Sequence, residues 1–472
     1  MKFILKYYWL LVPVLCFLGI RFGFDFDGLY GQDSYEYHRF TDAVQNYLLT
    51  GEHPGAFFWP VNYPLVASLM SFLTGTSWAL QLVSFCSFTI VLFLLKRILD
   101  SEYPNNRISS SYVLITTVLS PYFFRASLLQ MSDMLATLFV LLAIVNWRKY
   151  NTTNKNQYVY VFAAMAALAF FTRYVAILLL IPFGVHLLIH FWKGKAVKPF
   201  LISVVIFVLA CLPQFIFQTD SIQDYTYQLT ILDWDIANFF QSRFSTNNGQ
   251  LTHPFINLMY VFSPLLHPGY LLSGIGLVFF MIRYHSKPLR LSLFQKLLWI
   301  SVITYLFFLG GIPTQNMRFF ITVFPLVVIV LFNGYKLAVE KLSQKLFVIS
   351  FIIAALLQIT YFSISFSKLY ARHQLEKSIS NYILETSGDT PVYCFAVEGM
   401  LQTRGINRPI KSLYYEQFND FESGALLVFN LEQFEYQWKD ENPMINWNRI
   451  QENHQVIEMQ DLGQGWKIYR IE

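Results

Sequence analysis

Long apolar runs separated by short polar segments occupy the chain up to about residue 366. A transmembrane helix needs roughly 20 predominantly apolar residues, and about 17 is near the lower limit. Eleven runs approach this length, although several are short: 4–20, 77–95, 109–124, 132–147, 157–172, 174–191, 199–217, 268–283, 292–310, 317–335 and 346–366. The pattern predicts an α-helical polytopic membrane protein with about 11 transmembrane helices in residues 1–367.

The apolar run 157–191 allows two interpretations. It is interrupted only by Thr172-Arg173-Tyr174, and Lys155 and Lys193 flank it. Lysines prefer the cytoplasmic side, so an even number of passes must connect the two flanks. We therefore expect two short helices with Arg173 at the outer turn, because a single helix would place the later lysines outside.

The pattern changes at about residue 368. A helical pattern covers 368–385, and four short apolar runs follow, separated by turn-forming and helical stretches. Such runs are typical of buried strands. The expected strands lie at 391–397, 425–430, 455–459 and 466–471. The sequence predicts a small α/β domain in residues 368–472.

The basic residues give the orientation of the expected spans. With the N-terminus inside, the inner segments up to residue 367 hold 18 Lys and Arg, including every Lys, whereas the outer loops hold six Arg. Lys and Arg accumulate in cytoplasmic loops. The N-terminus is therefore expected in the cytoplasm, and the two long loops 21–76 and 218–267 and the α/β domain are expected outside. Within the first loop, the apolar stretch 65–73 is too short to span and predicts an interfacial or re-entrant helix.

Composition supports the membrane assignment and excludes other classes. Only 13% of the residues are charged and 55% are hydrophobic, whereas about a quarter of a soluble protein is charged. The net charge of +5 is spread between the spans, so no basic patch for nucleic acid is formed. The four cysteines form neither a CxxC metal pair nor a recognisable disulfide framework.

The stretch Gly31–Tyr37 is polar, aromatic and acidic, and it leads into a helical pattern at 39–49. Together with this stretch, the topology places a set of charged side chains on the outer face, each near the end of a span. Charges at the edge of the hydrocarbon are unfavourable, which favours a functional explanation. The set comprises Asp33, Glu36, Arg125, Asp133, Arg173 and Arg318.

Each member also has a structural explanation. Asp133 would complement the dipole of the helix that it opens, and the arginines would meet lipid phosphates. Glu36 fits a solvated acidic face, and Tyr37 fits either an aromatic belt or stacking on a sugar. Two acids on one helical face, Asp33 and Glu36, can alternatively bind a divalent cation, with His38 or His53 nearby.

The combination is more specific than its members. A carboxylate that takes a proton from a hydroxyl, beside arginines that hold a phosphate, is what transfer from a phosphate-linked donor requires. We expect Asp33 to be the base and Arg318 or Arg173 to hold the departing phosphate, whose negative charge grows in the transition state.

The order of these motifs resembles the GT-C superfamily of integral-membrane glycosyltransferases. It is similar to bacterial relatives of dolichyl-phosphate-mannose protein mannosyltransferases and of lipid A aminoarabinose transferase. The resemblance covers roughly residues 1–340. It rests on Asp33-Ser34-x-x-Tyr37 leading to Ala43, Pro64-Leu65 with a helix ending at Gly75, Ser132-Asp133, Phe171-Thr172-Arg173-Tyr174, and Met317-Arg318-Phe319-Phe320 with Pro325.

The resemblance implies an inverting glycosyltransferase of the bacterial inner (cell) membrane that uses a polyprenyl-phosphate sugar at the extracytoplasmic face. It implies Asp33 as general base, Asp133 as the second acidic position and Arg318 as a contact of the donor phosphate. The acceptor would be a lipid, a glycan or a protein. Many family members have Asp-Glu in the catalytic loop, whereas this chain has Asp33-Ser34, so a role for a metal ion stays open.

Three other functions fit parts of the pattern. A flippase or transporter of lipid-linked saccharides would share the arginines and aromatic grooves, but it more often has charges at midspan and internal repeats. A polymerase of lipid-linked saccharides would act at the same face. A structural subunit of a membrane complex would need no chemistry at Asp33.

Overall fold

The computed structural model describes residues 8–104, 108–217, 233–246, 249–284 and 291–472. The chain divides into two compact units. The first unit comprises Met1–Gly28, Phe40–Phe240 and Phe255–Phe366. The second comprises Leu29–Arg39, Gln241–Pro254 and Ser367–Glu472. The second unit therefore combines the C-terminal segment with two short segments from the expected outer loops.

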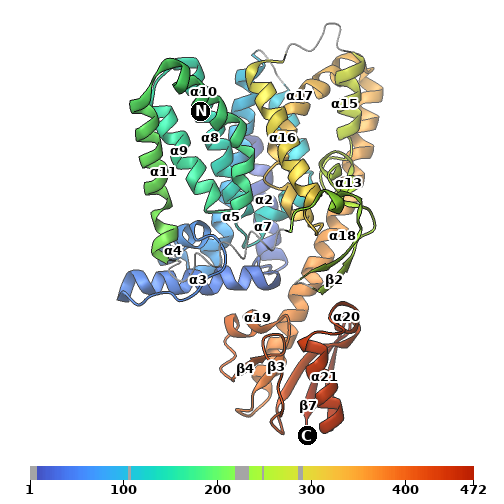
Figure 1. Cartoon of the computed structure of the whole chain (residues 1–472). Helices are drawn as coiled ribbons and strands as arrows, with labels where there is room; N and C mark the ends of the chain where they lie inside the picture. The colour runs from blue at the N-terminus through green and yellow to red at the C-terminus, as the bar shows by residue number, and fades with distance from the viewer. Residues whose placement is uncertain (1–7, 105–107, 218–232, 247–248, 285–290) are drawn as a thin grey trace. The chain divides into compact units, whose positions relative to one another are not determined.

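The first unit is built from helices. Its helix α9 packs against α8 and α11, and α8 also packs against α5 (Figure 1). The helices and 3-10 helices wholly within this unit are η1 (Tyr8–Leu10), α2 (Leu11–Gly23), α4 (Asn62–Thr74), α5 (Thr76–Glu102), α6 (Ser109–Thr117), α7 (Pro121–Leu128), α8 (Asp133–Thr153), α9 (Gln157–Phe170), η2 (Tyr174–Leu179), α10 (Ile181–Gly194), α11 (Val197–Phe217), η3 (Ile236–Phe240), α13 (Asn257–Tyr260), α14 (Ser263–Leu266), α15 (Gly274–Arg283), α16 (Leu293–Gly311), η4 (Met317–Phe320) and α17 (Phe324–Lys341).

Within the described residues, each of the eleven expected spans overlaps a helix or a pair of helices, which confirms a helical, polytopic architecture. Residues 4–7 of the first expected span lie outside the described residues. Among the described residues, four helices are individually long and apolar enough to cross a membrane: α5, α11, α16 and α18 (Gln344–Glu385). The pair α7 and α8, bent by 108° at a short break, adds a fifth candidate. Other segments, such as η1–α2 and α9, are shorter apolar helices, so the number eleven stays a prediction.

The break at Arg173 is confirmed. Helix α9 ends at Phe170, Arg173 has an extended backbone (φ −152°, ψ 117°), and η2 and α10 follow. The side chain of Thr172 donates to the carbonyl of Leu168, 2.6 Å away, where α9 ends. The apolar run 157–191 is thus two helical segments joined at Arg173, as the charge pattern predicts.

Two expectations for the first outer loop fare differently. The short apolar helix is present as α4, which ends at Thr74 with Gly75 as its C-cap. Its first residue contacts α9, because Asn62 Nδ2 donates to Leu168 O at 3.1 Å. The stretch Gly31–Tyr37, expected to precede a helix, is itself helical, because α3 runs over Gly31–Thr50. Ser34 accounts for the early start: its Oγ accepts from Tyr30 N at 2.7 Å and donates to Gly31 O at 3.0 Å.

The second unit contains a five-stranded mixed sheet in the order β4-β3-β5-β7-β6. Strands β4, β3 and β5 are parallel, whereas β5–β7 and β7–β6 pair antiparallel. The strands are β3 (Val392–Cys394), β4 (Ile410–Ser412), β5 (Leu426–Asn430), β6 (Val456–Gly463) and β7 (Trp466–Ile471). The four expected strands are confirmed, and β4 was missed because it has only three residues and is half-buried.

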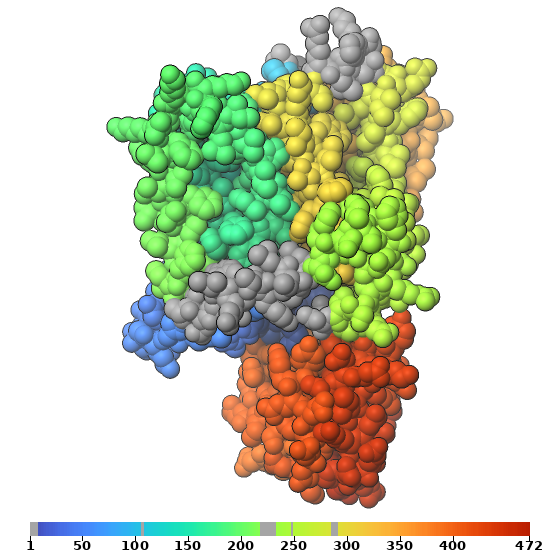
Figure 2. Space-filling model, viewed as in Figure 1, coloured from blue at the N-terminus to red at the C-terminus, as the bar shows by residue number. Residues whose placement is uncertain are grey.

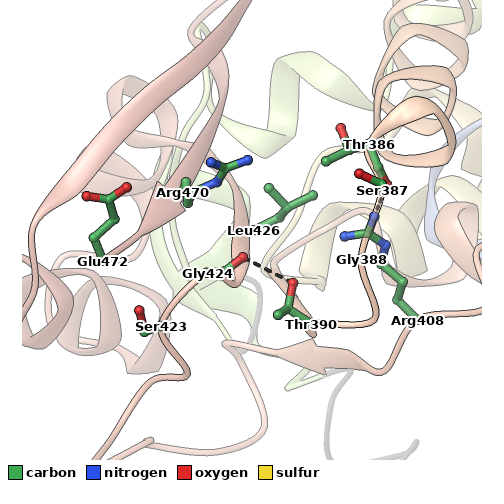
Figure 3. Close-up of a pocket in the computed structure, with 10 residues that line it drawn as sticks. All are labelled: Thr386, Ser387, Gly388, Thr390, Arg408, Ser423, Gly424, Leu426, Arg470 and Glu472. Atoms are coloured by element: carbon green, nitrogen blue, oxygen red, sulfur yellow. Dashed lines mark hydrogen bonds between the residues drawn. The ribbon is translucent and has the colours of Figure 1, made fainter.

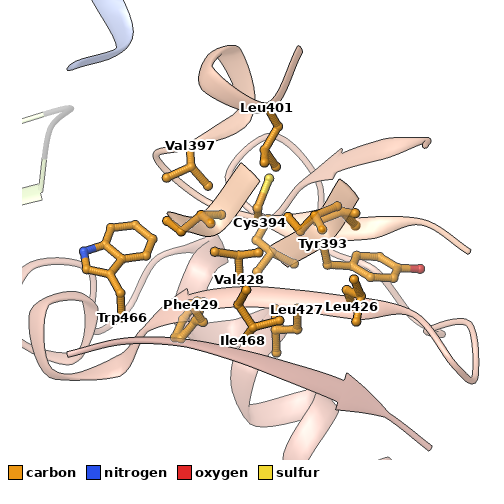
Figure 4. Packing of buried hydrophobic residues seen from close by; sticks show 14 of the residues in the cluster. Tyr393, Cys394, Val397, Leu401, Leu426, Leu427, Val428, Phe429, Trp466 and Ile468 are labelled. Carbon is orange, nitrogen blue, oxygen red and sulfur yellow. The ribbon is translucent and has the colours of Figure 1, made fainter. Parts of the chain in front are cut away.

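Helices cover the sheet of the second unit. They are α19 (Glu398–Thr403), α20 (Leu431–Gln437), α21 (Asn442–Asn453) and the C-terminal part of α18. The expected helix 368–385 is therefore not separate, because α18 continues into it without a break. Buried side chains of β3, β5 and β7 form the core, and Leu401 packs on them from α19 (Figure 4). In the space-filling view, residues 367–472 form one closely packed body (Figure 2).

A small hairpin that the sequence did not indicate belongs to the same unit. Strands β1 (Arg243–Thr246) and β2 (Gly249–Thr252) pair antiparallel within the expected outer loop 218–267. Strand β2 packs against α20, where Tyr436 Oη bonds to Thr252 Oγ1 at 3.1 Å. A Cβ at Gly249 would lie 2.3 Å from the carbonyl oxygen of Gln437, so this contact requires glycine.

Candidate active site

A buried carboxylate bound by two arginines is the central feature of the first unit. Asp133, the first residue of α8, is only 1% exposed. Its Oδ1 accepts from Arg173 Nη1, and its Oδ2 accepts from Arg318 Nε at 2.6 Å. The two arginines come from segments far apart in the sequence, and the fold brings them to one acid.

The break between α7 and α8 fixes the position of Asp133. Side chains of α5 reach carbonyl groups of this break: Gln81 Nε2 donates to Leu128 O at 2.9 Å, and Ser84 Oγ donates to Met131 O at 3.0 Å. The backbone N–H of Gln130 donates to Gly28 O at 2.9 Å. Because these polar groups are buried, losing a partner would be unfavourable. The network therefore holds the start of α8 in place.

Arg173 occupies the turn between α9 and η2. Its guanidinium lies 5.7 Å from the centre of the Phe319 ring, within the range of a cation–π contact. The side chain is 13% exposed, and that of Arg318 is 18% exposed. Both arginines are thus oriented by Asp133, and a small part of each side chain stays exposed.

The backbone around Arg318 is held by side chains that donate to carbonyl oxygens. The donors come from the segments before α15 and from α16, and they are buried. Asn257 Nδ2 donates to Ile312 O at 2.7 Å, Tyr260 Oη to Asn316 O at 2.6 Å, Tyr270 Oη to Met317 O, and Tyr305 Oη to Phe319 O at 2.9 Å. Asn316 Oδ1 in turn accepts from the amide of Arg318 at 3.0 Å.

These four donors were not identified from the sequence. The aromatic residues of the outer loops suggested a membrane belt or sugar stacking, because tyrosine favours interfaces. The available signal was weak: a tyrosine or asparagine in an otherwise apolar run needs a hydrogen-bond partner when buried. Their partners are carbonyl groups that lie 14 to 56 residues away in the sequence, which a pattern of residue types does not reveal.

We expect Tyr260→Phe to destabilise the protein while leaving the ring packed. The change removes the donor of Asn316 O, and a buried acceptor without a partner costs about 1–3 kcal/mol. Unfolding by denaturing detergent would measure the loss. Tyr284→Phe is the matched control, because Tyr284 is more than a third exposed; equal stability of the two variants would contradict the role given to Tyr260.

Arg125, on α7, belongs to the same unit. Its Nη1 donates to Ser365 Oγ at 2.9 Å, and its guanidinium lies 4.8 Å from the centre of the Tyr122 ring. Four of the seven predicted site residues, Asp133, Arg173, Arg318 and Arg125, are therefore in the first unit.

The remaining three, Asp33, Glu36 and Tyr37, lie on the part of α3 that belongs to the second unit. Asp33 is half-buried in the first turn of the helix, where an acid complements the helix dipole. Both carboxylate oxygens of Glu36 accept from Arg39, from Nε at 2.8 Å and from Nη2. Tyr37 is 3% exposed. Glu36 therefore has a structural partner in Arg39, and the side chain of Asp33 is partly exposed.

The described residues contain no group of three or more His, Cys, Asp or Glu side chains that could hold a metal ion. His38 and His53, which the sequence suggested as neighbours of such an ion, are not part of one. The thiol of Cys394 is poorly suited to act as a nucleophile, because burial raises its pKa well above the ordinary value and the charge of Glu398 acts in the same direction.

Each unit has a cavity apart from these residues. In the second unit, hydroxyl groups and the guanidinium groups of Arg408 and Arg470 surround a cavity of about 460 Å³ (Figure 3). Arg408 there donates to Thr386 O. In the first unit, an apolar cavity of about 270 Å³ is lined by residues of α6, α15, α17 and α18, such as Phe280 and Phe351.

The arrangement around Asp133 suits an anion. Two arginines on one carboxylate leave an excess of one positive charge, and an arginine has five N–H donors, so each can contact Asp133 and a second acceptor. Planar guanidinium groups bind phosphate with two parallel hydrogen bonds. The site therefore has the charge and the donors that a phosphate group requires.

Comparisons with known proteins find one matching family model and similar solved structures. Residues 53–217, less than half of the chain, match the family model described as dolichyl-phosphate-mannose-protein mannosyltransferase. No curated protein matches the sequence significantly. The fold is similar to that of ArnT from Cupriavidus metallidurans bound to undecaprenyl phosphate, with a TM-score of 0.62 and 12% identity over 98% of this chain and 97% of that one.

The apo structure of the same ArnT is similar as well, with a TM-score of 0.60 and 12% identity over 97% of each chain. At this identity the likeness concerns the fold, which extends over nearly the whole chain and includes the C-terminal unit. The family model and the fold thus confirm the expected resemblance to the GT-C superfamily of membrane glycosyltransferases.

Proposed function

With the GT-C fold as the premise, we propose that this chain is a membrane glycosyltransferase that moves a sugar from a polyprenyl-phosphate donor to an acceptor hydroxyl. The observation that carries the proposal is the buried Asp133 with Arg173 and Arg318 on its two oxygens. The family name refers to a dolichyl-phosphate sugar, and one similar structure contains undecaprenyl phosphate. Both are polyprenyl phosphates.

Arg318 and Arg173 would bind the phosphate of the donor. The phosphate gains negative charge as its bond to the sugar breaks, so donors that are already oriented stabilise the transition state more than the ground state. Asp133 would act by orienting the guanidinium groups. Both of its carboxylate oxygens are buried and accept hydrogen bonds from the two arginines. The geometry therefore favours a positioning role for Asp133 over the role of second catalytic acid that the resemblance implied.

Asp33 would act as the general base. Its carboxylate takes the proton of the acceptor hydroxyl while that oxygen attacks the anomeric carbon. The bond from this carbon to the phosphate oxygen breaks, and the polyprenyl phosphate leaves with the electron pair. A single displacement of this kind inverts the anomeric configuration. The acceptor is a lipid, a glycan or a protein hydroxyl.

The reaction would take place at the extracytoplasmic face of a bacterial inner membrane. The distribution of Lys and Arg supports this orientation, with the N-terminus in the cytoplasm and the C-terminal domain outside. The alternatives are a flippase or transporter and a polymerase of lipid-linked saccharides. A polymerase would transfer a saccharide block from one lipid carrier to another, and a flippase would leave the phosphate–sugar bond intact.

We expect the purified protein to release undecaprenyl phosphate from undecaprenyl-phosphate-linked mannose, glucose or pentose probes, labelled with carbon-14 in the sugar, when an envelope extract supplies acceptors.

Arg318→Gln should weaken binding of undecaprenyl phosphate about ten- to hundredfold, because a hydrogen bond to a charged group contributes about 1.5–3 kcal/mol. Binding is measured by thermophoresis in detergent. The anomeric configuration of the product, determined by NMR, tests inversion.

Arg243→Gln is the matched control, because Arg243 is another arginine of the expected outer face, exposed on β1. It should bind the lipid phosphate as the wild type does. Equal binding by the Arg318 and Arg243 variants would contradict the phosphate site. Movement of the probe across liposomes without release of undecaprenyl phosphate would instead support the flippase.

A further inference from the structure

Two residues near the start of α3 are part of the hydrophobic core of the second unit: one precedes the helix and the other is its fifth residue. Leu29 and Tyr35 are 4% and 2% exposed, and the other buried members of this core come from residues 375–471. The core thus consists of the C-terminal domain and one short segment more than 300 residues earlier in the chain. Asp33 lies on that segment.

Tyr35 binds a buried carboxylate of the C-terminal domain. Its hydroxyl donates to Glu376 Oε2, and Glu376 is 1% exposed. The other oxygen, Oε1, accepts from Arg372 Nε at 2.8 Å, one turn earlier on α18. The Arg372 guanidinium also lies 4.7 Å from the centre of the Trp466 ring. A buried carboxylate needs such partners, so Tyr35 is one of the groups on which this ion pair depends.

A second contact lies on the other side of Asp33. Gln32 Nε2 donates to Glu398 Oε2 at 2.9 Å, and Glu398 Oε1 accepts from Ser412 Oγ at 2.7 Å. Helix α19 also approaches closely here, because a Cβ at Gly399 would lie 3.0 Å from the Cβ of Tyr35. Asp33 is therefore bracketed by two residues that bind the C-terminal domain.

From these contacts we infer that Tyr35 and Glu376 are positioning residues for the base, and that holding Asp33 is a function of the C-terminal domain. The inference rests on the proposed role of Asp33. A catalytic group must be held within about 0.5 Å of its productive position, and a misplacement of about 1 Å can reduce the rate about hundredfold. The buried Tyr35–Glu376–Arg372 network, which lies within the second unit, supplies that constraint.

The test compares turnover of the full-length enzyme before and after Tyr35→Phe, which removes one hydroxyl and keeps the ring. We expect kcat to fall about tenfold or more and the KM for the undecaprenyl-phosphate sugar to change less than about twofold, because the base and not the donor site is displaced. Tyr436→Phe is the matched control, since it removes a hydrogen-bonded hydroxyl from an exposed position of the same unit. It should keep wild-type kcat.

A double-mutant cycle shows whether Tyr35 acts through Asp33. In the Asp33→Asn background, Tyr35→Phe should lower the residual rate by less than about twofold, because the group that it positions is already gone. An equal proportional loss in both backgrounds would overturn the inference. So would wild-type kcat for Tyr35→Phe.

Hydrogen–deuterium exchange separates this inference from the proposed function. Peptides covering 29–39 should exchange faster in Tyr35→Phe than in Tyr436→Phe. If Asp33→Asn is fully active, the base assignment fails, and the exchange experiment still reports whether Tyr35 holds the segment. Unchanged exchange over 29–39 would overturn the holding role itself.

A second variant covers the case that Tyr35→Phe does not fold. Gln32 is exposed, so Gln32→Ala should fold, and it removes the contact with Glu398. It should lower kcat severalfold, with the same dependence on Asp33. Wild-type kcat for Gln32→Ala, together with unchanged exchange over 29–39, would overturn the inference.

Discussion

Asp33→Asn is expected to lower the rate of sugar transfer at least about hundredfold, because general-base catalysis contributes roughly 10²–10⁴. Asparagine keeps the shape of the side chain and removes its ability to take a proton. Binding of undecaprenyl phosphate should stay within about twofold of the wild type, because the proposed phosphate contacts are the arginines of the first unit. Single-turnover transfer of labelled sugar and lipid-phosphate binding would be measured on the same preparation.

Asp25→Asn is the matched control for this experiment. Asp25 lies in the same outer segment, is exposed, and has a positive φ of 49°, a conformation that asparagine tolerates. It should transfer sugar at the wild-type rate. Wild-type transfer by Asp33→Asn would contradict the base assignment, and equal losses in both variants would indicate a general effect of charge in this segment.

Asp133→Asn should destabilise the protein by about 3–5 kcal/mol, because removing one partner of a buried ion pair leaves uncompensated charge. Two arginines, with side chains 13% and 18% exposed, would lose their common carboxylate. Transfer should fall as well, since the arginines would no longer be oriented. Unfolding by denaturing detergent gives the change in the free energy of unfolding.

Two variants make this prediction specific. Glu340→Gln removes an acid that is 50% exposed and lies 3.8 Å from Lys336, so its effect on stability should stay below about 1 kcal/mol. Adding Arg173→Gln to Asp133→Asn removes one of the unpaired charges and should restore part of the stability but not the activity. A double variant less stable than Asp133→Asn would contradict this account of the buried charges.

Several local features were predictable from the sequence. The break at Arg173 followed from the placement of flanking lysines, and the helix α4 from an apolar stretch too short to span. The strands β3, β5, β6 and β7 followed from short apolar runs between turns. In each case the signal lies within a few neighbouring residues, because burial in lipid or in a sheet imposes a local pattern of apolar positions.

The hydrogen-bond and ion-pair partners of the charged residues were harder to predict from the sequence. Asp133 and Arg318 were recognised as candidates from their positions at span ends, but their ion pair joins residues 185 positions apart. The support of the Arg318 segment by Tyr260 and Tyr305 was missed, because one hydroxyl in an apolar run does not reveal which carbonyl it will meet. The early start of α3 was missed because a short polar stretch resembles a loop.

The sequence by itself determined the class of this protein: the helices, the small α/β domain and the charged residues gathered at one expected face. The spacing of apolar residues, the lengths of the apolar runs and the distribution of lysines are properties of the sequence itself. They can therefore be recognised without the tertiary structure. Only the tertiary structure decided that Asp133 is shared by Arg173 and Arg318, and that Tyr35 joins Glu376, 341 residues later. Such partners are set by packing between distant segments, because a buried charge takes whichever donor the fold brings within hydrogen-bond distance.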